Sequence, residues 1–268
     1  MLIDSHCHLA SHRFPSEEVC RLVERAREAG VHQLVTLATG MDDLETNLEL
    51  ARRYPEVHAC LGIHPCDVQD SPDDFAETLR PLLSAPQVAA VGETGLDYYH
   101  PAPAGWDDSS LRARQATFLD QHFELAAQAG LNLVIHTRDK SGTASFEEAL
   151  AIYQNHAKRV RAVFHCFVGT FANAHRVLEL GGLVSFGGVA TFKNAREVLE
   201  VVTQLDPGSF MLETDSPYLA PHPHRGSRNE PAFTRVIAEK IAMSRAESLE
   251  ELAQHTTKTA REFFRGLE

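Results

Sequence analysis

The sequence predicts an α/β fold of the TIM type, a (β/α)8 barrel with an extra C-terminal helix. Short apolar runs rich in β-branched residues alternate along the chain with longer segments of helical period. These runs are almost continuously apolar, which is typical of parallel strands that helices cover. Eight such runs occur in 268 residues, and both numbers suit one TIM barrel. We therefore expect residues 1–268 to form a single domain.

The expected strands follow the apolar runs in chain order. They cover residues 2–9, 32–39, 57–65, 88–99, 131–138, 160–167, 182–191 and 210–218. A doubly wound open sheet is the alternative arrangement of the same elements. That fold usually carries a glycine-rich turn after its first strand. No such turn follows the first run here, so the closed barrel is favoured.

Capping residues mark the ends of the expected helices. Residues 16–30 begin with Ser16, a good N-cap, and end at Gly30, while residues 111–130 also end in glycine. These helices lie between expected strands, as the βα repeat of a barrel requires.

Two helices are expected after the last strand, over residues 229–245 and 248–267. Ser248 and Glu251 match a capping box at the start of the second one. A barrel needs only one helix after its last strand. The final helix is therefore predicted to be an extra one, packed on the outside.

The composition is that of a globular cytoplasmic protein. Hydrophobic residues make up 43% and charged residues 23% of the chain, and no apolar run approaches the ~20 residues of a membrane span. Asp4 and His6 interrupt any secretory-signal pattern at once. Five cysteines without a Cys-x-x-Cys pair fit a reducing compartment better than a disulfide framework. We expect a monomer with no membrane partner.

The net charge limits the way in which the chain can meet nucleic acid. Acidic residues outnumber basic residues 37 to 25, giving a formal charge of −12. This disfavours a protein that grips long nucleic acid through a broad basic surface. It leaves open an enzyme that handles a strand end at a local site, above all one whose cations are metal ions.

Histidine and carboxylate side chains, which commonly bind metals, occur in the first expected strand and at the ends of later apolar runs. In the first strand, Asp4, His6 and His8 alternate, so their side chains share one face. The C-terminal ends of barrel strands meet at one face of the molecule. We expect one small volume to hold His6, His8, Glu93, His136, His165 and Asp215.

Six such side chains in one volume indicate bound cations. Without them, carboxylates and imidazoles would be crowded at a high desolvation cost. Six ligands exceed the need of one tetrahedral ion with an open position. Two divalent ions bridged by a carboxylate fit better, about 3.5–4 Å apart. The mixture of nitrogen and oxygen suits Zn²⁺ or Mn²⁺, and Mg²⁺ where oxygens dominate.

Several motifs, in this order, resemble the TatD family of metal-dependent hydrolases. They are DSHCHL, GIHP, GETGLDYY, IHTR, HCFVG, LETDSPYL, PHPHRG and NEP, and the resemblance spans nearly the whole chain. It implies a TIM barrel with a two-metal site that hydrolyses DNA phosphodiester bonds, often from the 3′ end. Single-stranded or frayed DNA would be the partner, with RNA as a second polymer.

The resemblance also implies residue roles. His6 and His8 would bind one metal, and His136 and His165 would bind the second. Glu93 would bridge the two metals. Asp215 would contact a metal and the nucleophilic water, and His64 would face the scissile phosphate. Two positions depart from the family pattern, Ala10 for Asp or Asn and Cys66 for a frequent His. Cys66 is expected to be a small packing residue rather than a thiol ligand.

In the expected mechanism Asp215 orients the water and accepts its proton, and the second metal or His64 stabilises the leaving oxygen. Arg138 and Arg225 are candidates to pair with phosphate oxygens as planar forks. For Arg225 the alternative is a salt bridge to a neighbouring carboxylate.

Other polar residues are assigned supporting roles. Asn194 and the pair Asn229–Glu230 are candidates to orient substrate, with helix capping as the alternative. Glu213 shares the face of Asp215 but lies deeper, so we expect it to support the metal ligands. Trp106, with Tyr98 and Tyr99, is a candidate surface for stacking an unpaired base, worth ~1–3 kcal/mol. The alternative is that Trp106 packs its loop against the barrel rim.

Two other functions compete with the nuclease. The same metals could attack a carbonyl, in an amidohydrolase or an ester hydrolase acting on a small molecule or D-aminoacyl-tRNA. Several barrel amidohydrolases bridge their metals with a modified lysine, whereas Glu93 at this position favours the nuclease. The third function is an idle barrel that binds metal and a partner, and the intact set of six ligands argues against it.

Overall fold

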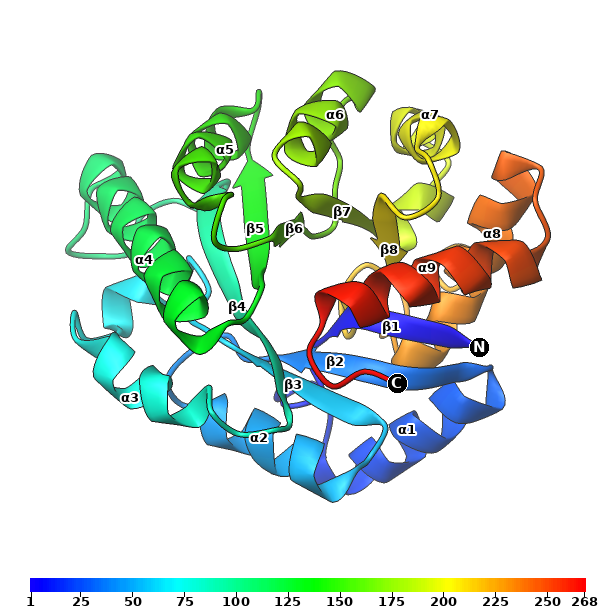
Figure 1. Ribbon diagram of the computed structural model, residues 1–268, viewed down its shortest axis with the longest axis horizontal. Helices are drawn as coiled ribbons and strands as arrows, with labels where there is room; N and C mark the ends of the chain where they lie inside the picture. The colour runs from blue at the N-terminus through cyan, green and yellow to red at the C-terminus, as the bar shows by residue number, and fades with distance from the viewer.

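In the computed structural model, which describes residues 1–268, eight parallel strands are hydrogen-bonded in chain order (Figure 1). The strands are β1 (Leu2–Cys7), β2 (Val31–Leu37), β3 (Val57–Leu61), β4 (Val88–Tyr98), β5 (Leu133–Asp139), β6 (Ala162–Phe164), β7 (Leu183–Phe186) and β8 (Phe210–Leu212). Helices surround this sheet, and the expected α/β barrel is confirmed.

Eight helices follow the eight strands, and a ninth helix ends the chain. They are α1 (Val19–Glu28), α2 (Leu44–Arg53), α3 (Phe75–Leu82), α4 (Asp108–Ala129), α5 (Ala144–His156), α6 (Phe171–Glu179), α7 (Arg196–Gln204), α8 (Thr234–Arg245) and α9 (Leu249–Phe263). Four short 3₁₀ turns are η1 (Ser16–Glu18), η2 (Val68–Asp70), η3 (Gly188–Thr191) and η4 (Pro231–Phe233). The capping box of Ser248 and Glu251 at the start of α9 is present as expected.

The last strands are shorter than the apolar runs that predicted them. β7 ends at Phe186, and the apolar residues after it form η3 instead of more strand. β8 ends at Leu212, three residues before Asp215. Apolar residues such as Ala190 and Pro217 in these two segments are buried outside the sheet, so hydrophobicity alone overestimates strand length.

The barrel is nearly closed by residues that lie just beyond β8. Cys7 of β1 forms an isolated parallel bridge with Ser216. The N–H of Asp215 donates to the carbonyl of His6 at 2.8 Å, and the N–H of His8 donates to the carbonyl of Ser216 at 2.7 Å. This seam therefore holds His6, His8 and Asp215 side by side.

Asp4 stabilises the same seam from below. Its buried carboxylate accepts hydrogen bonds from the backbone N–H of Thr214 at 2.8 Å and from the Thr214 hydroxyl at 2.6 Å. Asp4 thus ties β1 to the end of β8, which explains an acidic residue two positions before His6.

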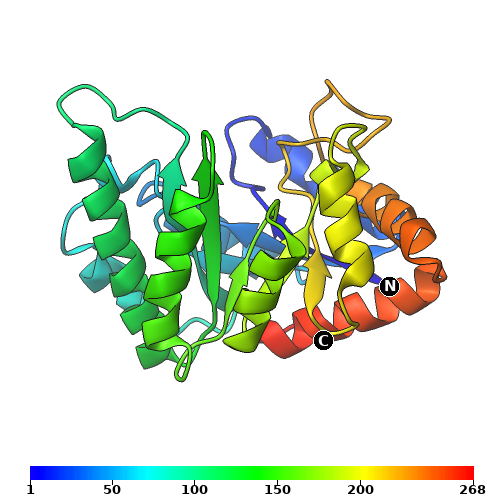
Figure 2. The same cartoon turned by 90° about the horizontal axis from the view of Figure 1, so that it is seen from above.

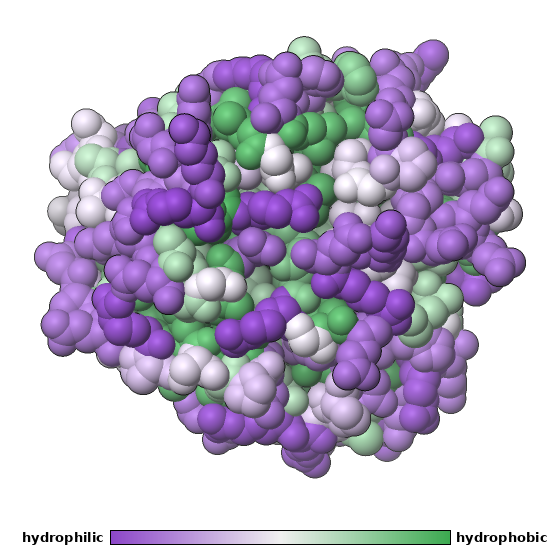
Figure 3. Space-filling model, viewed as in Figure 1, coloured by the Kyte–Doolittle hydropathy of each residue, from purple (hydrophilic) through white to green (hydrophobic).

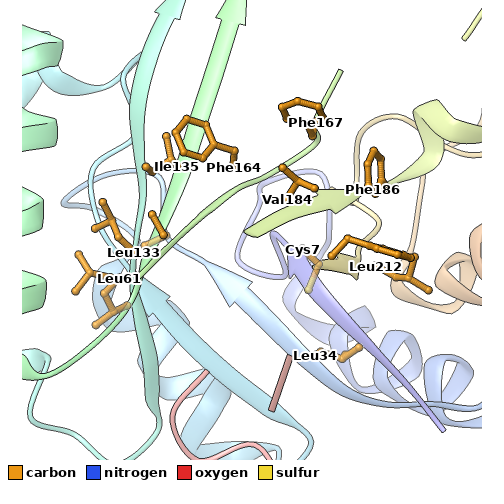
Figure 4. Packing of buried hydrophobic residues seen from close by; sticks show 14 of the residues in the cluster. Cys7, Leu34, Leu61, Leu133, Ile135, Phe164, Phe167, Val184, Phe186 and Leu212 are labelled. Carbon is orange, nitrogen blue, oxygen red and sulfur yellow. The ribbon is translucent and has the colours of Figure 1, made fainter. Parts of the chain in front are cut away.

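Two buried clusters form the core. The larger one fills the layer between the sheet and the helices (Figure 4). The smaller one takes apolar side chains from all eight strands, on the opposite face of the sheet, together with Phe263, Phe264 and Leu267 from the end of the chain. Because alternate strand residues point into a barrel, this second cluster is its interior.

Helix α9 closes one end of the barrel, which differs from the expected position on the outside. It crosses in front of β1 in Figure 1, and its last residues join the interior cluster. Ala260, Phe263, Phe264 and Leu267 cover that end with apolar side chains. The opposite end is the one left for functional residues.

The long segments that follow β1, β4 and β8 all rise on the side away from α9 (Figure 2). This is the C-terminal end of the strands, where TIM barrels carry their functional residues. The α9 side presents a surface dominated by hydrophilic side chains (Figure 3). No helix is both long enough and apolar enough to cross a bilayer.

Strand β4 is the longest strand and is buried along its whole length. Its register against β5 shifts between Val91 and Thr94. Gly95 has a φ of +143°, and a Cβ atom there would lie 2.0 Å from the carbonyl oxygen of His136. Only glycine allows so close an approach. β4 and β5 are thereby drawn together where Glu93 and His136 face each other.

Candidate active site

The C-terminal end of the barrel brings the other five expected ligands together around Glu93. The shortest distances from the Glu93 carboxylate oxygens are 2.8 Å to His165 Nε2, 3.0 Å to His136 Nδ1, 3.2 Å to His6 Nε2 and 3.5 Å to His8 Nε2. Asp215 completes the group, with Oδ1 3.4 Å from His8 Nε2. Residues far apart in the sequence thus share one buried pocket.

His6, His8, Glu93 and Asp215 form the first donor set. Nε2 of His6 lies 3.2 Å from Nε2 of His8, 3.2 Å from Glu93 Oε2 and 3.8 Å from Asp215 Oδ1. Nε2 of His8 lies 3.5 Å from Glu93 Oε2 and 3.4 Å from Asp215 Oδ1. Four ligands bound at zinc distances would stand about 3.3 Å apart in a tetrahedron. The spacing of this set therefore fits a small divalent cation.

Glu93, His136 and His165 form the second donor set. Nδ1 of His136 lies 3.0 Å from Glu93 Oε1 and 3.2 Å from Nε2 of His165, which is itself 2.8 Å from the same oxygen. These separations also match ligands of one small cation. The rings of His6 and His165 stack with centroids 3.9 Å apart, so the two sets adjoin.

The two oxygens of Glu93 face different sets. Oε2 faces His6 and His8, whereas Oε1 faces His136 and His165. Glu93 is only 2% exposed. A carboxylate that presents one oxygen to each of two adjacent imidazole pairs has the geometry of a bridging ligand.

The outward nitrogen of three ligand histidines faces an acceptor. Nδ1–H of His8 donates to the carbonyl of Leu37 at 3.1 Å, and Nε2–H of His136 donates to Asp97 Oδ2 at 3.2 Å. Nδ1 of His165 lies 3.4 Å from Glu213 Oε1. Such partners fix the tautomer of metal-binding histidines, so in the neutral form of each ring the inward nitrogen presents its lone pair to the pocket.

These inward lone pairs provide a test of whether cations fit. Each points at a carboxylate oxygen of Glu93 or Asp215 at 2.8–3.5 Å. A lone pair and a carboxylate repel each other unless a proton or a cation lies between them. A cation in each donor set satisfies every such contact at once, so the residues fit divalent metal ions.

Electrostatics in the pocket are dominated by Glu93. Burial alone would raise the pKa of Glu93, but the nearby His165, His6 and His64 and a hydrogen bond with His136 hold it well below its usual range. Burial lowers the pKa of His165, yet the charge of Glu93 and the contact with Glu213 raise it well above its usual value. The pocket therefore keeps an ionised carboxylate at its centre.

His64 lies at the edge of the second donor set and presents a hydrogen-bond donor to it. The N–H of Cys66 donates to His64 Nδ1 at 3.1 Å, so the proton of the neutral ring is on Nε2. Nε2 is 3.7 Å from Glu93 Oε1. Burial lowers the pKa of His64 to about 3, which keeps the ring neutral. Its inward N–H suits contact with an oxygen rather than with a metal.

The sequence-based reasoning missed Asp97, which the structure places beside His136. Asp97 is 3% exposed, and its Oδ1 accepts hydrogen bonds from the N–H groups of Tyr99 and His100, both at 2.9 Å. These bonds orient Oδ2 toward Nε2 of His136. A signal was present, because residues 93 and 97 have the same parity in one strand and so share a face.

Glu213 lies where the sequence predicted it, below Asp215. Its carboxylate is fully buried and accepts hydrogen bonds from the N–H of Cys166 at 2.7 Å and from the hydroxyl of Ser185 at 2.5 Å. These two bonds leave Oε1 also facing His165 Nδ1. Glu213 therefore links the segments at the ends of β6, β7 and β8 and faces the outward nitrogen of His165.

Replacing Glu213 with glutamine is expected to weaken metal binding about 10–100-fold, which is typical when the partner of a ligand histidine is changed. Glutamine keeps the shape but removes the charge that faces His165. Metal content after dialysis against graded chelator measures the effect. The exposed Glu250 on α9 provides the control, since Glu250→Gln should leave metal content unchanged. Equal metal retention in both variants would contradict this role.

The residues expected to bind substrate lie around the pocket, and they differ in which side chains they contact. The guanidinium of Arg138 lies 4.0 Å from the ring centroid of Tyr99, and that of Arg225 lies 3.9 Å from the centroid of Phe192. Neither arginine forms a salt bridge, so the alternative expected for Arg225 is wrong. Asn194 is exposed, and Ala195 rather than Asn194 occupies the N-cap of α7.

Trp106 and Tyr98 are placed differently from Tyr99. Trp106 is half-buried against the core, with the guanidinium of Arg114 5.6 Å from its ring centroid. Tyr98 is buried, and its hydroxyl donates to Glu148. Tyr99 is 44% exposed, so it offers the accessible ring of the three.

Asn229 and Glu230 hold the loop after β8. The buried Asn229 amide donates to the carbonyl of Thr214 at 2.8 Å and to that of Tyr218 at 2.6 Å. Glu230 pairs with Arg25 at 2.6 Å. These contacts fix the segment that carries Asp215, so both side chains act on the shape of the site.

Comparison with known proteins identifies several close relatives. Residues 3–265 match the sequence model of a family described as TatD related DNase. YabD of Bacillus subtilis, described as an uncharacterized metal-dependent hydrolase, is 32% identical over 99% of each chain. A protein of Edwardsiella piscicida described as a 3′-5′ ssDNA/RNA exonuclease TatD is 31% identical over 98% of this chain and 99% of its own. The crystal structure of YjjV, a TatD homolog from Escherichia coli, superposes with a TM-score of 0.87 at 29% identity, covering 98% of this chain and 97% of that one.

Proposed function

The chain belongs to the TatD-related DNases, a family of metal-dependent hydrolases, and on this premise we propose that it is a two-metal exonuclease that shortens single-stranded DNA from the 3′ end. RNA is proposed as a second polymer, because one relative is described as an exonuclease of both. The main support for the proposal is that the two carboxylate oxygens of Glu93 face two different pairs of histidines.

We assign one cation to each donor set. His6, His8 and Asp215 would hold the first, His136 and His165 the second, and Glu93 would bridge them. When bound, such ions polarise phosphoryl oxygens and lower the pKa of a coordinated water to near 7.

Asp215 is proposed to accept the proton of the attacking water. Its backbone lies in the left-handed region, with a φ of +56°, which turns the side chain from the end of β8 over the pocket. Burial alone would raise the pKa of Asp215, but a hydrogen bond with His8 and the charges of His6, His8 and His165 lower it. An ionised carboxylate with an oxygen facing the pocket suits a general base.

His64, Arg138 and Arg225 are proposed to bind the phosphate groups. The inward Nε2–H of His64 can donate to the scissile phosphate or to the departing 3′-oxygen. Both arginines are exposed at the mouth and free of carboxylate partners, so their guanidinium groups are available to phosphate oxygens. Asn194 lies on the same segment as Phe192 and is proposed to contact the strand further out.

Tyr99 is proposed as the surface on which an unpaired base stacks, in preference to Trp106. Tyr99 is the more accessible ring, and Arg138 lies beside it to meet the adjoining phosphate. Stacking on an aromatic side chain contributes about 1–3 kcal/mol per base. A strand that is paired cannot offer its bases in this way, which accounts for a preference for single strands.

Replacing Tyr99 with alanine is expected to raise KM for a single-stranded oligonucleotide about 5–150-fold, the equivalent of that stacking free energy. Changes in kcat should be small, because Tyr99 does not touch the donor sets. Steady-state kinetics on one oligonucleotide measure both constants. Tyr99→Phe should restore KM, and Trp106→Ala should leave it unchanged. A rise in KM for Trp106→Ala alone would return the stacking role to Trp106.

The activity itself is tested with metal-stripped protein. 5′-Labelled single-stranded DNA, RNA and aminoacyl-tRNA are each incubated with Mg²⁺, Mn²⁺ or Zn²⁺ added in turn. We expect a ladder of DNA fragments that shorten from the 3′ end only after metal is returned, and no ladder with His165→Ala. Immediate release of labelled mononucleotide would show instead that the enzyme digests DNA from the 5′ end.

The same experiment separates the competing functions. If the aminoacyl ester is cleaved while the phosphodiester bonds stay intact, the protein is an ester hydrolase and not a nuclease. An absence of cleavage with every substrate and every metal would favour a barrel that binds metal without turnover.

A further inference from the structure

A second group of ligand-type side chains lies beside the site, outside the two donor sets. It consists of Cys66 in the segment after β3, Asp97 in β4 and His100 in the segment after β4. Their ligand atoms all lie within 4.8 Å of one another. We propose that these three residues form a separate divalent-cation site of mixed thiolate, carboxylate and imidazole type, suited to Zn²⁺.

The distances between the ligand atoms fit such a cation. Sγ of Cys66 lies 3.7 Å from Nδ1 of His100, which lies 3.0 Å from Oδ2 of Asp97. Zinc binds sulfur at about 2.3 Å and nitrogen at about 2.0–2.1 Å, which places those two ligands about 3.5 Å apart in a tetrahedron. Nitrogen and oxygen ligands would be about 3.3 Å apart. Small side-chain adjustments bring all three atoms to these values.

Two of the three ligands are held in place by the backbone. The N–H groups of Tyr99 and His100 both donate to Asp97 Oδ1, which leaves Oδ2 directed at the cluster. The N–H of Cys66 donates to His64 Nδ1, which anchors the backbone that carries the thiol. The site is therefore largely assembled by contacts that do not involve a cation.

The three side chains of the cluster range from buried to exposed, as expected for a metal site that is open to solvent on one side. Asp97 is 3% exposed, Cys66 is half-buried, and the side chain of His100 is 51% exposed. Three protein ligands with one side open to solvent leave a fourth position for water or a substrate atom. Thiolate is a soft ligand, and it favours Zn²⁺ over Mg²⁺ or Ca²⁺.

The cluster is joined to the second donor set through Asp97. Its Oδ2 lies 3.0 Å from His100 Nδ1 and 3.2 Å from His136 Nε2. A cation bound here would share this carboxylate with the outward N–H of His136. Occupancy of the site is thus coupled to the orientation of a ligand in the proposed catalytic centre, although the site does not depend on any catalytic activity.

Cobalt substitution tests the proposal without using a substrate. Metal-stripped full-length protein is titrated with Co²⁺ while absorption is recorded from the near-ultraviolet to the visible. A thiolate bound to Co²⁺ gives an intense near-ultraviolet charge-transfer band, whereas the imidazole and carboxylate donor sets give none. We expect this band in the wild-type protein, its loss in Cys66→Ser and its marked reduction in His100→Ala.

Two cysteine variants provide matched controls. Cys20 is exposed on α1, and Cys166 follows the ligand His165. Cys20→Ser and Cys166→Ser should both retain the band, and Cys66→Ser should bind one Zn²⁺ fewer per chain by elemental analysis. Circular dichroism verifies that each variant is folded. An absent band in the wild-type protein, or a band that survives Cys66→Ser, would overturn the proposal.

Discussion

Replacing Glu93 with glutamine is expected to lower kcat/KM by about 10³-fold or more. Glu93 presents one oxygen to each imidazole pair, so its loss affects both donor sets at once. Glutamine retains one acceptor oxygen but carries no charge and presents an N–H₂ group to the other set. Metal held by the two donor sets should fall from the proposed two ions per chain toward one or none, and the proposed site at Cys66 is counted separately.

The measurement combines elemental analysis with kinetics on a single-stranded oligonucleotide. Glu148→Gln provides the matched control, because Glu148 is an exposed glutamate that accepts only the hydroxyl of Tyr98. It should keep full metal content and near wild-type activity. Unchanged metal content in Glu93→Gln would refute a bridging role, even if activity were lost.

The arrangement of the barrel could be read from the sequence because it depends on patterns that recur in every βα unit. Eight apolar runs predicted eight strands, and all eight occur in the expected order. Strand ends were less predictable. The apolar residues after Phe186 pack as a 3₁₀ turn under the loop that follows β8, and only tertiary contacts distinguish such a turn from more strand.

The role of α9 could not be predicted from its own residues. An apolar stripe on a helix indicates that one face is buried but not what covers it. Phe263 and Phe264 insert into the open end of the barrel, a position that exists only after eight strands have closed. The helix was therefore expected correctly as an element and placed wrongly in space.

The meeting of six histidine and carboxylate side chains could be predicted because each follows the apolar part of a strand, and the C-terminal ends of barrel strands converge. Asp97 was missed although the expected strand, residues 88–99, includes it, because ligand-type residues were sought only where the apolar part of each strand ends, and that part ends just before Glu93. The proximity of Cys66 and His100 depends on two loop conformations, and loops carry no periodic pattern that fixes their path. The sequence therefore indicated the centre of the site more fully than its surroundings.

Replacing Asp215 with asparagine is expected to lower kcat about 10²–10⁴-fold, the contribution of a positioned general base. Asparagine keeps an oxygen at the position that faces His8 but cannot accept the proton of the attacking water. KM should change little, because the phosphate contacts proposed for His64 and Arg138 remain. Metal content should fall less than in Glu93→Gln, since His6, His8 and Glu93 still supply three ligands to the first set.

Single-turnover cleavage, with enzyme in excess over a labelled oligonucleotide, measures the chemical step in Asp215→Asn directly. The matched control is Asp206→Asn, which changes an exposed aspartate just before β8 and should leave kcat unaltered. The decisive comparison is between rate and metal content in the same preparation. If Asp215→Asn loses metal in proportion to its loss of rate, Asp215 acts only as a ligand. If metal is retained while the chemical step slows, the side chain moves the proton, because the nearby Asp97 carboxylate is directed at the outward nitrogen of His136.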